Sequence, residues 1–572
     1  MTGTSSSITA RWPRATTTAG PLTPALAAIA YGLILLLVWA PFARTSGMGW
    51  ETYYTIVSED SGSWTNFLYL PDPLRIHASE VYELAYRLGE LLGMRGSFFP
   101  YQLVYAGLWW LRSVLVFLLV RRLAPGATIL ALTAGAILMV HAPDVLLGWL
   151  GQLHQFAYFV WLLIALHLLL SCLQPLKTTR VVAYVALTGL VEYLCLWTYE
   201  GPLFIMAAAP VVLIFLVRPG LARRVLVVSA VWYVPIAVYL YQTFQKYLVV
   251  SASGYQQSLM RQSFTPGAIL GDWLFNVRYS LSFWAWVPQD GDLRPGQIAA
   301  LSVGVVAVFL AAGFAVSRWN DPDWLSPVRV KRLWSLLAAG VVLLFLSFPA
   351  QLMLAAAREP RRTQLLSGIA ASIVLGTLCS LLAAAFPKPR LRQLCAVAIA
   401  VPIVFIGAWR TIERQDAHRV EWNIHWPAMQ RLVRSIPRVR DDTVVVMTNV
   451  PKSRDPFYGS HFWFDNALRL AYPRTRVAGI YFYEDGSPGP GMNLRLHERQ
   501  WSYTNEGVTP LITSADVGQT LALRDDPAGV QVLAEIPAFV CSDACARQPY
   551  EPRARIQAGP PAIEARHRYG GS

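Results

Sequence analysis

Long apolar runs are the feature that most constrains the fold of this chain. A helix that crosses a bilayer needs about 17–25 apolar residues, and most runs of this kind here contain no charged residue. Because backbone polar groups in lipid must be hydrogen-bonded within their own segment, each run is expected to form a helix. The predicted spans, about eleven, cover residues 24–42, 100–120, 127–142, 153–173, 181–199, 203–217, 225–245, 298–317, 333–356, 364–386 and 393–410.

The charge of the chain agrees with this interpretation. Only 14% of the 572 residues are charged, against about 25% in soluble proteins. The net charge of +14 would indicate a nucleic-acid partner in a soluble protein. Here the basic residues lie mostly in short connections between apolar runs, so membrane topology explains them and no nucleic-acid partner is expected.

The basic connections predict the orientation of the chain. Residues 121–122, 177–180, 218–224, 318–332 and 388–392 carry Lys and Arg, whereas the alternate connections 141–152 and 200–202 carry none. Since cytoplasmic loops are enriched in Lys and Arg, the N-terminus is predicted to be cytoplasmic. An odd number of spans then places the C-terminus outside, in an integral protein of the inner or plasma membrane.

The predicted fold class is a mainly α, polytopic membrane protein with a small extracytoplasmic α/β C-terminal domain. The expected division is a cytoplasmic tail at residues 1–23, a transmembrane domain at 24–410 and the outer domain at 411–572. Two outer loops are long, one at 43–99 and one at 246–296. The second contains an aromatic, amphipathic stretch that predicts an interfacial helix or a short re-entrant hairpin.

The C-terminal region has the composition of a globular domain. Residues 442–448, 476–483 and 530–535 predict strands, and residues 426–436 have helical spacing. Cys541 and Cys545 form a C-x-x-x-C pair in a polar stretch, which predicts a disulfide if this region lies outside the cytoplasm.

Two adjacent carboxylates, Glu59 and Asp60, follow the first span in the first outer loop. A solvated acidic turn is one interpretation of such a pair. The other is chemical, because a carboxylate within hydrogen-bond reach of an acceptor hydroxyl acts as a general base.

The layout of a first span and an acidic outer loop resembles the GT-C superfamily of membrane glycosyltransferases. These include protein O-mannosyltransferases and bacterial enzymes that use polyprenyl-phosphate-linked sugars. In this sequence the second span is introduced by Ser97-Phe-Phe-Pro100 and closed by Arg121-Arg122, the third ends at His141-Ala-Pro-Asp144, and His154 opens the fourth. The resemblance covers roughly residues 24–410.

The resemblance implies a mechanism and a donor. The catalytic carboxylate corresponds to Asp60 or Glu59, the donor is a polyprenyl-phosphate sugar, and the acceptor is a glycan, lipid or protein. Some members carry Asp-x-Asp in this loop and use a divalent metal such as Mg or Mn, whereas this chain has Glu-Asp. Metal dependence therefore stays open, and no metal ligand or certain cofactor is assigned.

Further binding residues are predicted on the outer side. Arg358, Arg361 and Arg362 break the positive-inside pattern, and their guanidinium groups match phosphate oxygens; lipid head-group anchoring is the alternative. Tyr199 and Glu200 end a span, where the carboxylate is a candidate for binding sugar hydroxyls or pairing with an arginine; an interface-exposed helix end is the alternative. His154 and Arg278 complete the predicted set, Arg75 and His77 are possible acceptor contacts, and Glu192 inside a span is a possible partner of Arg112.

Two other functions compete with the transferase. A polysaccharide polymerase or ligase also has many spans and a large outer loop, but the early loop here is acidic. A non-enzymatic lipid or glycan transporter would carry charges and helix breaks at mid-membrane. The polar residues of this chain gather at the outer face, which favours an inverting transferase acting there.

Overall fold

The computed structural model describes most of the predicted spans and the C-terminal domain. The described residues are 22–44, 74–141, 150–173, 178–217, 222–246, 261, 263–282, 291–318, 324–353, 364–457, 459–491, 494–497, 499–503, 512, 514–541 and 549–570.

Every predicted span contains a helix. Within the described residues, nine helices are long and apolar enough to cross a membrane, and two shorter apolar helices accompany them. The long helices are α1 (Leu22–Trp39), α4 (Phe99–Leu123), α6 (Leu153–Cys172), α7 (Thr178–Leu196), α9 (Ala222–Phe244), α12 (Pro295–Ser317), α13 (Pro327–Leu346), α15 (Ser367–Ala384) and α16 (Pro389–Ser435), and the shorter ones are α5 (Thr128–Met139) and α8 (Leu203–Val217). The mainly helical fold class is confirmed, and the count of eleven spans stays a prediction.

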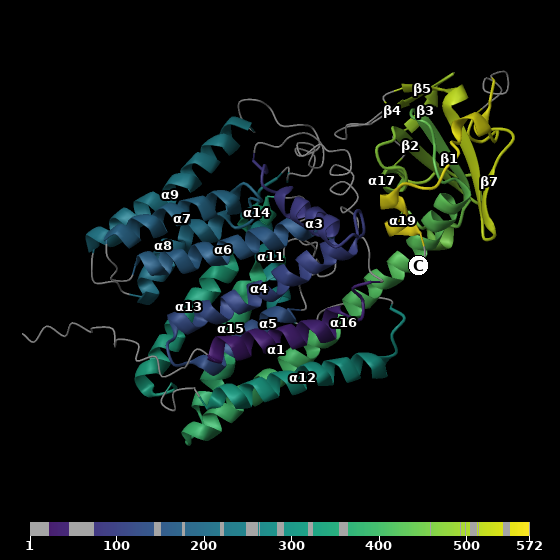
Figure 1. Ribbon diagram of the computed structural model, residues 1–572. Coiled ribbons are helices and arrows are strands. Elements are labelled where there is room, and N and C mark those ends of the chain that lie inside the picture. The colour runs from purple at the N-terminus through teal and green to yellow at the C-terminus, as the bar shows by residue number, and fades with distance from the viewer. Residues whose placement is uncertain are drawn as a thin grey trace, which may run out of the picture.

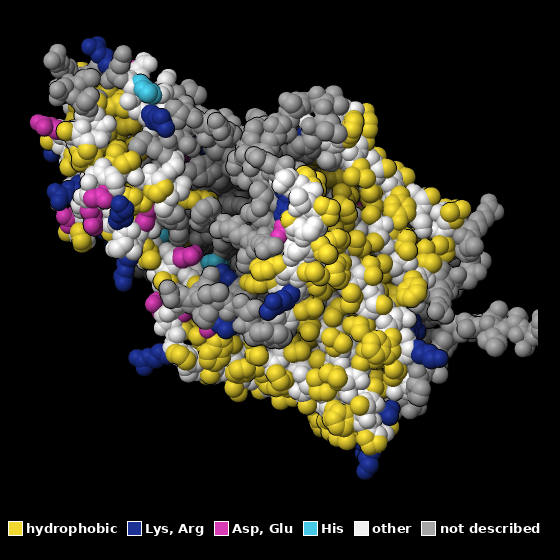
Figure 2. Space-filling view, turned by 180° about the vertical axis from the view of Figure 1, so that it is seen from behind, with side chains coloured by type: hydrophobic (Ala, Val, Ile, Leu, Met, Phe, Trp, Pro, Cys, Tyr) yellow, Lys and Arg dark blue, Asp and Glu magenta, His cyan; other side chains and the backbone are white. Residues whose placement is uncertain are grey.

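The surface of the helical part is the one expected of a protein in lipid. Large apolar side chains point outward along several helices, including Ile29, Leu226, Val303 and Phe314, each more than half exposed. The space-filling view shows hydrophobic side chains over most of this part (Figure 2). Because apolar side chains can be exposed to lipid without the free-energy cost of exposure to water, this pattern identifies an integral membrane protein.

One long helix joins the membrane part to the C-terminal domain. Helix α16 has 47 residues, which corresponds to about 70 Å at 1.5 Å per residue. The apolar core of a bilayer is only about 30 Å thick. Its second half therefore extends beyond the membrane into the C-terminal domain (Figure 1), and the domain division predicted at residues 410 and 411 falls inside this helix.

The two ends of the helical part differ in charge. Helix α16 starts beside Lys388, Arg390 and Arg392 and rises into the C-terminal domain. We call the end that carries this domain the domain end. Helix α4 starts at the domain end, since the turn before it contacts the C-terminal helix α19 (Ile563–Tyr569), and it finishes with Arg121 and Arg122. This segregation agrees with a domain end on the extracytoplasmic side, which stays a prediction.

The C-terminal domain is built around a four-stranded sheet. Its order is β2-β1-β6-β7, in which β2 (Val477–Tyr483), β1 (Thr443–Val450) and β6 (Thr520–Asp526) are parallel and β7 (Gly529–Val532) is antiparallel. All three predicted strands are confirmed. The last turns of α16, together with α17 (His461–Ala471), pack on one face of the sheet. The other face carries a small antiparallel sheet of β3 (Leu494–His497), β4 (Gln500–Tyr503) and β5 (Ser514–Asp516).

Helix α19 fixes this domain to the membrane part. Arg568 donates from Nε to the carbonyl of Gly96 at 2.7 Å, and Glu564 forms an ion pair with Arg95 at 3.2 Å. Phe98 packs edge-on against Trp422 of α16, with 5.3 Å between the ring centres. These contacts hold the domain against the turn between α3 (Glu80–Leu91) and α4.

Part of the segment predicted to be interfacial or re-entrant forms helix α11 (Pro266–Leu281), whose polar side chains face inward. Its polar residues Asp272, Asn276 and Ser280 are buried against the protein, while Leu270 and Leu274 are about half exposed. A helix in water shows the opposite arrangement. The apolar outer face therefore indicates contact with lipid.

Candidate functional site

An ion pair between Arg75 and Glu200 forms the centre of the candidate site. Arg75 donates from Nη2 to Glu200 Oε1 at 2.6 Å and from Nε to Oε2 at 3.2 Å, a two-point geometry that holds the carboxylate in a fixed orientation. The side chain of Glu200 is still 38% exposed. It therefore keeps room for a further hydrogen bond from a ligand.

Aromatic rings surround this pair. The Arg75 guanidinium lies over the ring of Tyr199, 4.8 Å from its centre, and Tyr199 stacks on Tyr158 at 5.5 Å and 12°. His154 lies 5.7 Å from Tyr199 and within 3.1 Å of the Tyr82 hydroxyl.

Local structure explains why these residues meet at the domain end. Helices α6 and α7 are antiparallel neighbours, and the Cys195 thiol donates to the carbonyl of Tyr158 at 3.4 Å. The start of α6 therefore lies beside the end of α7, which brings His154 next to Tyr199. The backbone N–H of His77 donates to the carbonyl of Trp197 at 3.1 Å, which holds the segment before α3 across the end of α7.

Polar side chains continue from this pair along the domain end. Tyr199 hydrogen-bonds the side chain of Gln351 in α14 (Pro349–Leu352), and the backbone carbonyl of Met353 accepts from the N–H of Arg261. Arg261 pairs with Asp272 of α11. Gln364 then donates to Asn276 at 2.9 Å and accepts from Ser280, and the Ser280 carbonyl lies 3.1 Å from His141 Nε2. We call this connected set the polar belt; it comprises Arg75, Glu200, Tyr199, Gln351, Arg261, Asp272, Asn276, Gln364, Ser280 and His141.

The arrangement suits recognition of a sugar at the membrane boundary. The carboxylate and guanidinium supply strong acceptors and donors, and the rings of Tyr199 and Tyr158 supply flat apolar faces. A sugar ring presents hydroxyls at its edge and C–H groups on its faces, so it needs both kinds of partner. The domain end places this set where the head group of a membrane lipid would lie.

The structure brings three of the predicted binding residues together. Tyr199, Glu200 and His154 form one cluster, joined by Arg75 and His77 from the first outer loop. Arg278 is exposed on α11, away from the buried polar stripe of that helix. Their binding roles stay predictions.

Other predicted site residues lie outside the described residues. These are the catalytic candidates Glu59 and Asp60 and the phosphate-binding candidates Arg358, Arg361 and Arg362. Cys541 is disulfide-bonded, and its predicted partner Cys545 also lies outside the described residues. Among the described residues, no group of three His, Cys, Asp or Glu side chains is arranged to hold a metal ion.

One predicted pair was wrong. Arg112 lies over the rings of Phe156 and Phe159, at 4.8 and 5.4 Å, instead of pairing with Glu192. Both carboxylate oxygens of Glu192 are buried without a hydrogen-bond partner. The sequence shows two opposite charges inside spans, but it does not show that aromatic faces on α6 satisfy the guanidinium by cation–π contact.

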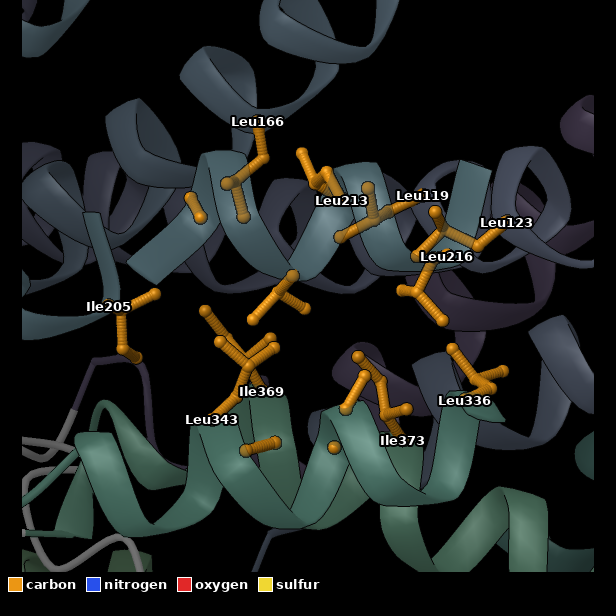
Figure 3. Close-up of a pocket in the computed structure, with 15 residues that line it drawn as sticks. Leu119, Leu123, Leu166, Ile205, Leu213, Leu216, Leu336, Leu343, Ile369 and Ile373 are labelled. Atoms are coloured by element: carbon orange, nitrogen blue, oxygen red, sulfur yellow. The ribbon is translucent and has the colours of Figure 1, made fainter. Parts of the chain in front are cut away.

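A small apolar cavity lies between helices of the membrane part. Its volume is about 30 Å³, and Figure 3 shows its aliphatic lining, with side chains pointing in from α8 on one side and from α13 and α15 on the other. The lining includes Leu213, Leu216, Leu343 and Ile369. A cavity of this size without polar groups stays dry. It therefore provides no route for water or polar ligands between these helices.

Comparisons with known proteins find similarity in structure only. No family model and no curated protein matches the sequence. ArnT from Cupriavidus metallidurans bound to undecaprenyl phosphate is similar over 78% of this chain and 85% of its own, with 14% identity and a TM-score of 0.37. The apo state of the same protein is similar over 75% and 83%, with 14% identity and a TM-score of 0.38.

Proposed function

We propose that this protein is a membrane glycosyltransferase that moves a sugar from a polyprenyl-phosphate carrier to an acceptor on the extracytoplasmic side. The observation that carries the proposal is the Arg75–Glu200 pair with its aromatic surroundings at the domain end. A partly exposed carboxylate, a fixed guanidinium and stacked tyrosines are the groups that a sugar needs. Their position at the end of membrane helices suits a sugar held on a lipid.

The chemistry requires one base and a stabilised leaving group. An acceptor hydroxyl oxygen attacks the anomeric carbon, the bond from that carbon to the phosphate oxygen breaks, and the carboxylate of Asp60 or Glu59 takes the hydroxyl proton. The lipid phosphate leaves as an anion. Arg358, Arg361 and Arg362 are the proposed cationic partners of that anion.

A divalent metal is compatible with this scheme and stays a question for experiment. The Glu59–Asp60 pair offers carboxylate oxygens, which are the ligands that Mg²⁺ prefers. If a metal binds there, it would stabilise charge on the leaving phosphate. Transfer measured with and without a chelator tests this point separately from the residues.

The first experiment substitutes the central pair and the proposed base. Membranes that contain wild type, Arg75→Met, Glu200→Gln or Asp60→Asn are compared for glycan and glycolipid products by mass spectrometry, with undecaprenyl-phosphate-linked sugars as donors. A charged hydrogen bond is worth about 1.5–3 kcal/mol, so each binding variant is expected to lower transfer about 10- to 100-fold. Asp60→Asn is expected to lower it further.

A matched control lies on the neighbouring helix. Arg87 of α3 also forms ion pairs, with Glu83 and Glu90, but its side chain is 60% exposed. Exposed pairs contribute little, and Arg87 lies outside the polar belt, so Arg87→Met is expected to leave transfer unchanged. Normal products in Arg75→Met, Glu200→Gln and Asp60→Asn alike would exclude the proposed enzyme.

A further inference from the structure

One face of α16 meets the membrane part at two levels. A Cβ atom added at Gly407 would lie 2.4 Å from the carbonyl oxygen of Val140, so the helix touches the end of α5 there. Fifteen residues later, Trp422 packs on Phe98 beside the start of α4. Thr411 and Gln415 lie between these levels on the same face, because residues three, four and seven apart line up along a helix. This stretch of α16 therefore faces the centre of the domain end.

Both of these side chains are buried and lack hydrogen-bond partners. Thr411 is 1% exposed and Gln415 is fully buried. Within the part of the chain that the structure describes, the Thr411 hydroxyl and both the Nε2 and Oε1 atoms of Gln415 have no hydrogen-bond partner. Leaving a buried polar group unpaired costs about 1–3 kcal/mol, and the great majority of such groups in folded proteins are paired. Two on adjacent turns of one face therefore need an explanation.

The chemistry of the two groups indicates what they would bind. An amide offers two donors and an acceptor, and a hydroxyl offers one donor and two acceptor positions. Neither side chain carries charge, so the two do not suit a phosphate or a metal ion. The hydroxyl groups of a ligand, in contrast, can hydrogen-bond to both the amide of Gln415 and the hydroxyl of Thr411. Side chains one turn apart are about 5–6 Å from each other, a spacing that neighbouring hydroxyls of one sugar ring can bridge.

The position of the pair agrees with a ligand at the domain end. Arg414, one turn after Thr411, interacts electrostatically with Tyr279 of α11, and Tyr279 precedes Ser280 of the polar belt. Figure 2 shows a hollow between the C-terminal domain and the membrane part, bordered by charged and histidine side chains. Thr411 and Gln415 lie on α16 between Gly407, which is next to the end of α5, and Trp422, which packs on Phe98.

We propose that Thr411 and Gln415 form a binding site for a hydroxyl-rich ligand, the acceptor or the sugar of the transfer reaction. This inference rests on the proposed function, since it names a second set of contacts at the same end of the helices. Both groups are enclosed in this conformation, so a ligand reaches them when neighbouring side chains move aside. The unpaired groups are then satisfied in the complex.

The test compares stability with activity. Residues kept for binding are often not the ones that stabilise a fold best. Gln415→Leu and Thr411→Val remove the unpaired groups at similar volume, so each is expected to raise the melting temperature of the purified full-length protein in nanodiscs by about 1–3 °C. The same variants are expected to lower sugar transfer at least tenfold. Gln393→Leu, at the opposite end of α16, is the control and should leave transfer unchanged.

A ligand measurement separates this inference from the proposed function. Methyl glucoside, methyl galactoside and methyl mannoside are added to the same preparations, and the melting temperature is followed. At least one glycoside is expected to stabilise wild type and not Gln415→Leu. If wild type is protected in this way but transfers no sugar, the proposed function fails and the binding site stands.

Two outcomes would overturn the inference. Variants that are more stable and keep both transfer and glycoside protection would show that the unpaired groups serve no ligand. Variants that are less stable than wild type would show that the groups have a structural partner instead.

Discussion

Asp455 in the C-terminal domain is half-buried and Gln415 on α16 is fully buried, and the two side chains differ in their number of hydrogen-bond partners. The Asp455 carboxylate accepts from the hydroxyls of Tyr481 and Tyr483, each at 2.7 Å, and from the backbone N–H groups of Phe457 and Gly459. The side-chain amide of Gln415 has no hydrogen-bond partner among the described residues. The first is saturated within the fold, whereas the second keeps its full bonding capacity.

This difference separates two uses of a polar side chain. In the C-terminal domain, Asp455 holds the loop after β1 against β2, and burial raises the pKa of Tyr481, so its hydroxyl stays a donor. At the domain end of the membrane part, unpaired groups reduce stability and gain nothing within the chain. The paired carboxylate of Asp455 stabilises a loop, whereas the unpaired amide of Gln415 has hydrogen-bonding capacity that the described residues do not use.

The largest expected effect is the loss of the saturated carboxylate. Asp455→Ala removes the acceptor of four hydrogen bonds and leaves two tyrosine hydroxyls with less to donate to, so it should destabilise the C-terminal domain by about 3–5 kcal/mol. Urea unfolding followed by tryptophan fluorescence measures this. Asp485→Ala serves as the control, because its pair with Lys452 is exposed. If Asp455→Ala and Asp485→Ala both lowered the free energy of unfolding by the same small amount, the hydrogen bonds of Asp455 would not stabilise the domain as proposed.

A smaller effect is expected at the ion pair between Arg431 of α16 and Asp525 of β6. Arg431 donates from Nη2 to both oxygens of Asp525, at 2.8 and 2.9 Å, and from Nε to Oδ1 at 3.1 Å. Asp525→Ala leaves the guanidinium without its carboxylate and should cost about 2–3 kcal/mol. Replacing both residues, with Arg431→Met and Asp525→Leu, should cost less than the sum of the single changes. Additive costs in urea unfolding would mean that the pair is not coupled.

The helices were predictable because their signal is local. An apolar run long enough to cross a bilayer specifies a helix wherever it lies, and every predicted span contains one. The three strands of the C-terminal domain were predictable for the same reason. The continuation of α16 through the predicted domain boundary was not predictable from the sequence. A helix that leaves the membrane still forms its own backbone hydrogen bonds, so it does not have to end where the apolar run ends.

The partners within the site were less predictable. Tyr199 and Glu200 are recognisable as a polar end of a span, but Arg75 is 125 residues away from Glu200 in sequence. Only the packing of the first outer loop across α7 brings them together. The missing partners of Gln415 are equally invisible in sequence, since a lack of hydrogen bonds is a property of the packed structure.

The smallest expected effect is a gain in stability at Glu192 of α7. Among the described residues, neither carboxylate oxygen of this buried glutamate has a hydrogen-bond partner, as for the side-chain amide of Gln415, but Glu192 lies within a span and is not part of the polar belt. Glu192→Leu removes the unpaired group at similar volume and should stabilise the protein by about 1–2 kcal/mol. Glu192→Gln, which keeps a polar group, should gain less. Thermal unfolding in nanodiscs measures both.

Glu413 of α16 is the matched control for this prediction. Its carboxylate accepts from Trp409 Nε1 and from Arg410 Nη1, both at 2.7 Å. Glu413→Leu therefore breaks existing bonds and should lower stability while Glu192→Leu raises it. Because Glu192 lies outside the polar belt, its replacement should also leave sugar transfer unchanged, in contrast to Gln415→Leu. Loss of transfer in Glu192→Leu would mean that an unpaired group within the membrane also serves the reaction, and the distinction between the two regions would have to be drawn elsewhere.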